Sequence, residues 1–418
     1  MLGEYSRTIG RRAALGPLYG GSKSLGRLAL CVVALVCVCS LPGQAPDEPS
    51  FVPMDEYIRT KNALEQYRAI AAEDDGALLP ETGKTVEPGD HYEGAPRLIR
   101  LLTRVGDLAA GAVNADTDLY QGPLVTAVQR FQTRHGLKPH GRIDKATLVQ
   151  LNTPLAFRVH QLELALERWR RRPYDPSRPA IVLNLPEFRL RALRERHVDL
   201  EMKIVVGQAP EHKTPLLSSE LETVIFRPYW NVPLSIQQAE LVPEITKDPS
   251  FLSANHFEIV DTEGVVQDAL SDDILSGLRS GAVRLRQTPG PGNTLGLAKF
   301  VFPNDYQVYM HATSAPGLFA RPRRDLSHGC IRVEKAPDLA EWVLQDEPGW
   351  PRERIVKAMH GSESISVNLT RPIQVVTMYV TAVALEDGEV HFFEDIYGED
   401  EAFEQALAGA APPPPLSR

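Results

Sequence analysis

Residues capable of nucleophilic chemistry gather in the segment HATSAPGLFARPRRDLSHGCIRV, which runs from His311 to Val333. Cys330 is the only cysteine of this segment, and the other cysteines of the chain all lie between residues 31 and 39. A thiolate becomes a strong nucleophile where a neighbouring histidine or positive charge lowers its pKa. Residues 312–326 form a loop long enough to bring Cys330 back beside His311. The pattern therefore indicates an acyl-transfer site with Cys330 as nucleophile and His311 as base.

The residues around Cys330 fit this chemistry. Gly329 permits a close backbone approach or an unusual φ angle directly before the nucleophile. A turn at this point would aim the sulfur and free backbone amides to bind an oxyanion. Arg324 and Arg332 are candidates for holding a substrate carboxylate, because guanidinium groups pair well with carboxylates.

Two alternatives remain open from these residue types alone. The first is a buried, unreactive cysteine beside a histidine whose hydrogen bonds are satisfied. The second is a zinc site formed by His311, His328 and Cys330, although the paired close spacings of common zinc motifs are missing.

Composition limits the class of protein. The chain has 418 residues, of which 43% are apolar and 24% charged, as expected for a soluble globular protein of two or three domains. Its net charge of −9 argues against nucleic acid as a partner.

Residues 1–45 differ from the rest of the chain. Basic residues from Arg7 to Arg27 precede the uncharged run LALCVVALVCVCSL, Leu28–Leu41. This order is typical of a secretory signal peptide or an N-terminal anchor in the inner membrane. We therefore expect a periplasmic or cell-envelope location. A lone cysteine in the exported part cannot form an internal disulfide, so Cys330 calls for a chemical role.

Helical patterns fill the first part of the mature chain. Residues 51–96 and 154–174 predict a helical scaffold whose two parts pack together, with Trp169 in its core. Residues 97–153 predict a compact unit of three helices, and Asp144 is the expected N-cap of the third. On the second helix, Arg130 and Arg134 lie four residues apart, so we expect both on one exposed side, available to anionic cell-wall groups. The apolar face of that helix consists of Leu124, Ala127, Val128, Phe131 and Leu137.

Alternating apolar residues begin after residue 178 and predict a mainly-β domain over residues 178–400. Helix and turn signals within residues 235–282 predict a helical insertion between strands. The sequence APPPPLSR places a disordered tail at residues 409–418.

The motif H-x15-S-H-G-C-I-R closely resembles the signature of the L,D-transpeptidases, which cross-link peptidoglycan with a cysteine. RPYWNVPLSI and DGEVHFFEDIYGED are similar to segments of the large branch of that family. In this branch a peptidoglycan-binding domain precedes the catalytic domain, and a capping insertion interrupts it. The string LVTAVQRFQTRHGLKPHGRIDKATLVQLN resembles the three-helix peptidoglycan-binding domain. The resemblance implies a multidomain α+β fold with a mainly-β catalytic domain.

The resemblance also implies roles for individual residues, and no metal or organic cofactor. Cys330 matches the nucleophile, His311 the general base and Tyr309 a residue near the oxyanion. Arg332 stands where many members have asparagine. The other matched positions are Ser327, His328 and Gly329 in the loop that shapes the site, and Trp230 and Asn231 in the WNVP stretch.

The implied reaction joins two peptidoglycan stem peptides by a 3→3 cross-link through a cysteine thioester. The same residues would also suit an L,D-carboxypeptidase, or an enzyme that attaches proteins to peptidoglycan or releases them. A non-catalytic protein that binds the cell wall is a further alternative. In each case the partners are the stem peptides and glycan strands of peptidoglycan.

Overall fold

The computed structural model describes residues 55–171, 174–267 and 269–409. The predicted signal peptide or anchor, residues 1–45, and residues 410–418 of the predicted tail lie outside these ranges. Within them, no helix combines the length and the apolar character needed to cross a membrane.

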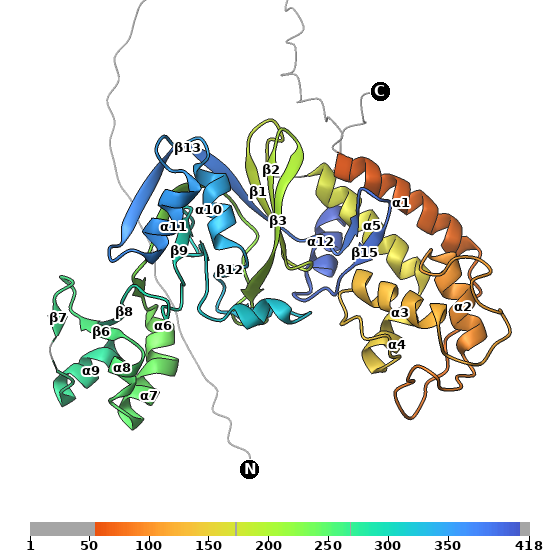
Figure 1. Cartoon of the computed structure of the whole chain (residues 1–418), viewed down its shortest axis with the longest axis horizontal. Helices are drawn as coiled ribbons and strands as arrows, with labels where there is room; N and C mark the ends of the chain where they lie inside the picture. Colours follow the sequence, from red (N-terminus) through yellow and green to blue (C-terminus); the bar gives the residue numbers. More distant parts are fainter. Residues whose placement is uncertain (1–54, 172–173, 268, 410–418) are drawn as a thin grey trace, which may run out of the picture. The chain divides into compact units, whose positions relative to one another are not determined.

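Two helices distant in the sequence form the scaffold. α1 (Asp55–Ala72) and α5 (Leu155–Arg170) lie side by side (Figure 1). They bury Tyr57 and Tyr67 against Leu162 and Trp169. The same core includes a hairpin near the C-terminus, formed by β14 (Ala382–Ala384) and β15 (Val390–Phe392). The scaffold is therefore packed directly on the end of the catalytic region.

The small helical domain consists of α2 (Ala95–Arg104), α3 (Pro123–Arg134) and α4 (Lys145–Leu151). The Asp144 carboxylate accepts a hydrogen bond of 2.8 Å from the Thr147 amide, which confirms the predicted N-cap. The stretch before α2, residues 79–92, packs into this domain and not into the scaffold. It contributes Leu79, Val86 and Tyr92 to the buried core, and Val86 pairs with Ile143.

The prediction that Arg134 is exposed and available to anionic cell-wall groups is wrong. Arg130 is exposed, but Arg134 is only 2% exposed. Its guanidinium donates to both carboxylate oxygens of Asp107, at 2.6–3.0 Å, and to the Tyr67 hydroxyl and the Val390 carbonyl. Arg134 therefore joins the small domain to the scaffold and the hairpin, and it cannot meet an external ligand.

The main sheet has nine strands in the order β11-β3-β12-β10-β9-β4-β13-β1-β2, and β2 also pairs with β3. This additional pairing closes the sheet on itself into a barrel. Apolar side chains such as Ile204, Phe300 and Ile331 fill its interior. The strands are β1 (Ala180–Asn184), β2 (Arg189–Arg194), β3 (His197–Gly207), β4 (Ser218–Phe226), β9 (Ala298–Val301), β10 (Met310–His311), β11 (Asp325–Ser327), β12 (Ile331–Val333) and β13 (Ile365–Met378).

Two helices complete the barrel core. α10 (Ala336–Leu344) contacts β3 and β9, and α11 (Arg352–His360) packs against α10 (Figure 1). Leu339 and Ile355 are fully buried among the residues of the strands. Together with the small domain, this arrangement confirms the predicted multidomain α+β fold with a mainly-β catalytic domain.

The insertion contains more than helices. A second sheet has the order β5-β8-β6-β7, and Ile245, Leu278 and Leu285 belong to its separate core. The prediction missed this sheet because its strands are only two to four residues long. The elements are β5 (Trp230–Asn231), α6 (Leu234–Ile236), the π-helix η1 (Gln237–Leu241), α7 (Val242–Lys247), α8 (Phe251–Ala254), β6 (Phe257–Val260), β7 (Val266–Gln267), α9 (Asp272–Ser280) and β8 (Arg284–Gln287).

The C-terminal part also differs from expectation. The apolar segment IQVVTMYVTAVAL does not form one continuous strand, because β13 ends at Met378 and the chain then turns into β14. A final helix, α12 (Glu399–Ala408), was not predicted. Three acidic residues in its first turn suit the positive end of the helix dipole.

Candidate active site

The predicted catalytic residues lie on, or directly before, two neighbouring parallel strands. β10 pairs with β12 so that Met310 is opposite Ile331 and His311 opposite Arg332. Met310 and Ile331 are fully buried in the barrel core. Because successive side chains of a strand point to opposite faces, the residues that flank this pair project away from the core. The residues brought together on that outer face are Tyr309, His311, Cys330 and Arg332.

These four side chains line one cavity of about 420 Å³. The barrel forms one wall, together with Ser327 and His328 of the loop before Cys330. The insertion forms the other wall, with Trp230, Glu240 and Phe257 among its lining residues. A cavity of this size accommodates a short peptide segment.

His311 has the properties of a neutral base. Its side chain is 3% exposed, and burial, together with the charge of Arg332, lowers its pKa to about 3. The carbonyls of Ala312 and Leu295 oppose this shift. The Nδ1 atom lies 2.5 Å from the Ala312 carbonyl oxygen, which can only accept a hydrogen bond. Nδ1 therefore carries the hydrogen, and Nε2 is left with a free lone pair.

Cys330 is a protonated thiol in the resting site. Burial raises its pKa, while hydrogen bonds from Tyr309 and the positive charges of Lys299 and Arg332 oppose that shift. No hydrogen bond joins His311 to the thiol in the part of the chain that the structure describes. The two side chains are diagonal neighbours across the β10–β12 pair.

The loop before Cys330 is held by its own hydrogen bonds. The Ser327 hydroxyl donates to the Cys330 carbonyl at 2.6 Å and accepts from the Gly329 amide at 3.2 Å. The Ile331 amide donates to the Tyr309 carbonyl. Among the described residues, no acceptor is bonded to the Cys330 amide. Gly329 has a φ of 106°, a conformation that favours glycine.

A support beneath this loop was not predicted. The Thr214 hydroxyl donates to the Gly329 carbonyl and accepts from the Gly207 amide, both at 2.8 Å. The Tyr397 hydroxyl donates to the Gly207 carbonyl at 2.6 Å. A Cβ atom on Gly207 would lie 2.9 Å from the Gly329 Cα, so only glycine permits this close approach.

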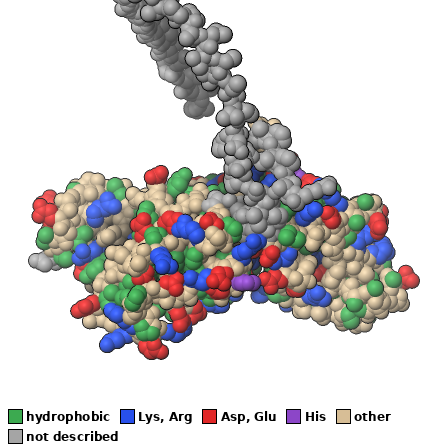
Figure 2. Space-filling model, turned by 90° about the horizontal axis from the view of Figure 1, so that it is seen from above, with side chains coloured by type: hydrophobic (Ala, Val, Ile, Leu, Met, Phe, Trp, Pro, Cys, Tyr) green, Lys and Arg blue, Asp and Glu red, His purple; other side chains and the backbone are tan. Residues whose placement is uncertain are grey.

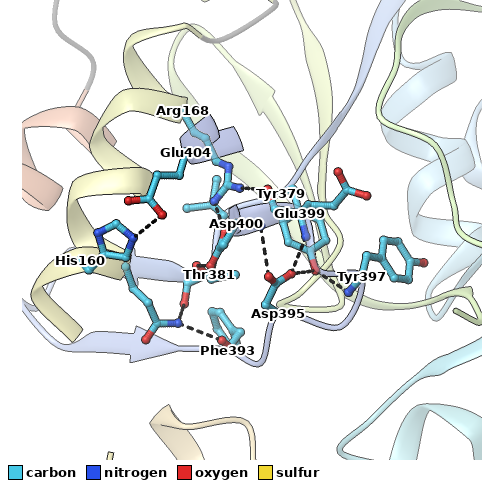
Figure 3. A network of polar contacts seen from close by, with 12 residues as sticks. His160, Arg168, Tyr379, Thr381, Phe393, Asp395, Tyr397, Glu399, Asp400 and Glu404 are labelled. Atoms are coloured by element: carbon cyan, nitrogen blue, oxygen red, sulfur yellow. Dashed lines mark hydrogen bonds and ion pairs between the residues drawn. The ribbon is translucent and has the colours of Figure 1, made fainter. Parts of the chain in front are cut away.

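The support continues into a polar network around Asp395 (Figure 3). The Asp395 carboxylate accepts from the Tyr379 hydroxyl at 2.5 Å and from the Glu399 amide at 2.9 Å. The Tyr379 hydroxyl in turn accepts from the Tyr397 amide at 2.7 Å.

Beside it, Asp400 on α12 binds Arg168 on α5 at 2.5 Å and the Thr381 hydroxyl at 2.8 Å (Figure 3). The scaffold and the unpredicted helix α12 are thus linked by hydrogen bonds to the loop that carries the nucleophile.

The insertion contacts the same loop through His328. Its Nε2 atom lies 2.6 Å from a carboxylate oxygen of Glu240 on η1. The His328 ring also packs on the ring of His212, with centroids 4.5 Å apart. Within the described residues, no group of three or more His, Cys, Asp or Glu side chains is arranged to hold a metal ion.

The structure does not bring all predicted residues to the cavity. Trp230 lines it, and its side chain also forms a hydrogen bond with the Tyr309 hydroxyl. Asn231 is exposed and is not a lining residue. The expectation that Arg324 holds a carboxylate is wrong, because its guanidinium is buried and donates to backbone carbonyls, including those of Phe188 and Ile204.

Lys299 was missed. It lies opposite His311 in the β9–β10 pair, and its Nζ atom is 3.8 Å from the centre of the Tyr309 ring. The alternation of Ala298, Lys299 and Phe300 would have placed this lysine on the outer face.

Two family models match the chain. Residues 178–359 match the model described as the L,D-transpeptidase catalytic domain, and residues 97–151 match that of the "Putative peptidoglycan binding domain". Residues 178–359 are therefore similar to the L,D-transpeptidase catalytic domain. This domain contains the barrel strands from β1 to β12, the insertion and the whole Cys330 cavity.

One curated protein is similar to more than half of the chain. A curated protein named "Putative L,D-transpeptidase" from Haemophilus influenzae is 33% identical over 238 residues, which are 57% of this chain and 48% of the relative. The chain therefore spans about half the length of that relative.

Among solved structures, an L,D-transpeptidase from Xylanimonas cellulosilytica has 14% identity and a TM-score of 0.22, with 72% of this chain and all of that chain covered. L,D-transpeptidase 3 from Mycobacterium tuberculosis, in complex with a faropenem-derived adduct, has 12% identity and a TM-score of 0.23, with 48% and 60% covered.

Proposed function

We propose that this protein is a peptidoglycan L,D-transpeptidase that forms 3→3 cross-links through a thioester on Cys330. The observation that carries the proposal is the register of β10 and β12. It places Tyr309, His311, Cys330 and Arg332 on one face, inside one cavity. The matched catalytic and peptidoglycan-binding domains support the choice of substrate.

In the first step, the Cys330 sulfur attacks the carbonyl carbon of the third residue of a donor tetrapeptide stem. His311 Nε2 accepts the thiol proton as the carbon–sulfur bond forms. The same proton then passes to the nitrogen of the terminal D-alanine, and the carbon–nitrogen bond breaks. D-Alanine leaves, and the acyl group remains on the sulfur as a thioester.

In the second step, the side-chain amine of the third residue of another stem attacks the thioester carbonyl. His311 accepts a proton from this amine as the new amide bond forms. The carbon–sulfur bond then breaks, and the proton returns to the Cys330 sulfur. Both steps pass through an oxyanion, for which the Cys330 amide and the Tyr309 hydroxyl are the available donors. Arg332 and Lys299 supply positive charge beside it.

Incubation of the purified protein with tetrapeptide-containing muropeptides tests the proposal. Mass analysis should find cross-linked dimers that have lost one D-alanine, and none with Cys330→Ala. If tripeptides are the only product, the protein is an L,D-carboxypeptidase. Products that contain a protein side chain, formed only when a protein acceptor is added, would assign an attachment enzyme. Binding to sacculi without any product would assign a wall-binding protein.

This substrate lies outside the cytoplasm, so we also propose export. The basic residues and apolar run of residues 1–45 support export, whether this segment is cleaved or kept as an anchor. Fractionation of cells that express the full chain, followed by mass analysis of its N-terminus, decides between the two forms.

A further inference from the structure

A second cavity lies between the small helical domain and the barrel. Its volume is about 490 Å³, and it shares no lining residue with the cavity of Cys330. We call it the interdomain cleft. Residues 136–139 of the small domain line one side, and the β1–β2 turn at residues 186–189 lines another. The loop at residues 319–324 and the segment at residues 391–396 also contribute to the lining.

Positive charge predominates in the interdomain cleft. Over the face of the molecule shown in Figure 2, basic and acidic side chains are interspersed. The cleft lining, in contrast, contains seven basic and three acidic side chains. The basic residues are Lys138, Arg189, Arg191, Lys203, Arg321, Arg323 and Arg324, and the acidic ones are Glu187, Glu201 and Glu394.

All three acidic side chains are already paired. Glu187 binds Arg191 at 2.5 Å, and Glu201 lies 2.9 Å from the same guanidinium. Glu394 binds Arg323 at 2.9 Å. Two carboxylates outside the lining also pair with its cations, Asp325 with Arg323 and Glu334 with Lys203. The remaining positive charge lies on Lys138, Arg321 and Arg324.

Two of the exposed cations of the cleft have no carboxylate partner among the described residues. Within the described ranges, no carboxylate forms an ion pair with Lys138 or Arg321, and both residues are exposed. Lys138 belongs to the small domain and Arg321 to the loop between His311 and Cys330. Both line the same cleft, so a ligand that contacts both side chains would bridge the two domains.

The cleft also offers apolar surface. Leu137 of the small domain and Phe188, Phe319, Leu385 and Phe393 are among its lining residues. Its volume lies within the range of small-molecule and peptide sites, about 300–1,000 Å³. Apolar walls with a few cations suit a ligand that carries both carboxylates and short alkyl groups.

We propose that the interdomain cleft binds a carboxylate-bearing peptide, namely a second peptidoglycan stem, while another stem occupies the cavity of Cys330. A stem peptide has free carboxylates for Lys138 and Arg321, and alkyl side chains for the apolar walls. The identity of this ligand rests on the proposed function. The buried Arg134–Asp107 pair holds the small domain against the hairpin, so the cleft is preformed.

Binding is measured by isothermal titration calorimetry, with a soluble disaccharide-tetrapeptide and the Cys330→Ala full chain, which cannot turn it over. The test variant adds Lys138→Glu and Arg321→Glu. A matched control adds Lys61→Glu and Lys145→Glu, the same change of charge on exposed residues outside the cleft. The proposal predicts at least tenfold weaker binding for the test variant than for the control, and weaker binding of a ligand whose carboxylates are amidated.

Three results would overturn the proposal. The first is equal affinity of the test and control variants for the disaccharide-tetrapeptide, and the second is equal affinity for the amidated ligand and the free acid. The third is displacement of the ligand by inorganic phosphate, which would show that the cleft binds anions in general. Carbapenem acylation of the unsubstituted protein is followed in parallel. Its absence would count against the proposed function, whereas the calorimetry alone decides the cleft.

Discussion

Replacement of Arg134 by methionine should strongly lower the free energy of unfolding of the protein. The Arg134 and Asp107 side chains are 3% and 2% exposed. Methionine keeps much of the volume but removes every hydrogen bond of the guanidinium and leaves the Asp107 carboxylate buried without its partner. Such a change typically costs about 3–5 kcal/mol. Burial already raises the pKa of Asp107 against the opposing effect of Arg134, so the isolated carboxyl should bind a proton.

The assay is equilibrium unfolding in urea at neutral pH, with Arg130→Met as the matched control. Arg130 lies one turn earlier on α3 and is exposed, so its replacement should change the free energy of unfolding by less than about 0.5 kcal/mol. The double variant Arg134→Met/Asp107→Leu should recover most of the loss, because it removes the unpaired charge. Equal losses for the two single arginine variants would refute the reasoning.

Three other predictions concern the active site. Thr214→Val should lower the free energy of unfolding by about 2–4 kcal/mol and slow acylation of Cys330 by a carbapenem, because the Gly207 amide and the Gly329 carbonyl lose their shared partner. The control Thr214→Ser should behave like the unsubstituted protein in urea titrations and in acylation time courses. Equal behaviour of the two variants would contradict the role of the Thr214 hydroxyl beneath the loop. Burial lowers the pKa of His311 to about 3, whereas unfolded histidine has a pKa of about 6.5, so the unfolded chain binds more protons between these values. The free energy of unfolding should therefore fall as the pH falls from about 6.5 towards 3. Its loss between pH 7 and pH 5, measured by urea unfolding, should be smaller in His311→Gln. Equal losses in the two proteins would show that His311 does not contribute to this pH dependence. Lys299→Met should raise the pKa of the Cys330 thiol further, because the Lys299 ammonium favours the thiolate. The pH midpoint of Cys330 alkylation by iodoacetamide should move upward in this variant but not in the control Lys299→Arg. An unchanged midpoint in Lys299→Met would exclude an influence of Lys299 on the thiol.

The sequence predicted that Cys330 and His311 share a site, but not the strand pairing that brings them into one cavity. Residue types and the loop length connected His311 with Cys330. Their shared face, however, depends on the parallel pairing of β10 with β12, which joins segments separated by a long loop. Lys299 was within reach of prediction, because strand alternation alone separates it from Ala298 and Phe300. Thr214 and Tyr397 were not, since their role arises only where distant chain segments meet beneath Gly329.

The errors in the helical region have a similar physical origin. The helical pattern of α3 correctly placed Leu124, Val128 and Phe131 in the core. It could not show that Asp107, which follows α2, approaches α3 beside Arg134 and draws this arginine into the interior. In the insertion, strands such as Val266–Gln267 are too short for alternation to distinguish them from turns.

Mass spectrometry of the acyl-enzyme tests the central claim most directly. The purified protein is mixed with a tetrapeptide stem, quenched in acid and digested, and the thioester is located by peptide mapping. We expect a stem-derived acyl group that has lost D-alanine, attached to Cys330, and no adduct in Cys330→Ala. An adduct on another residue, or one that persists in Cys330→Ala, would contradict the assignment of Cys330 as the nucleophile.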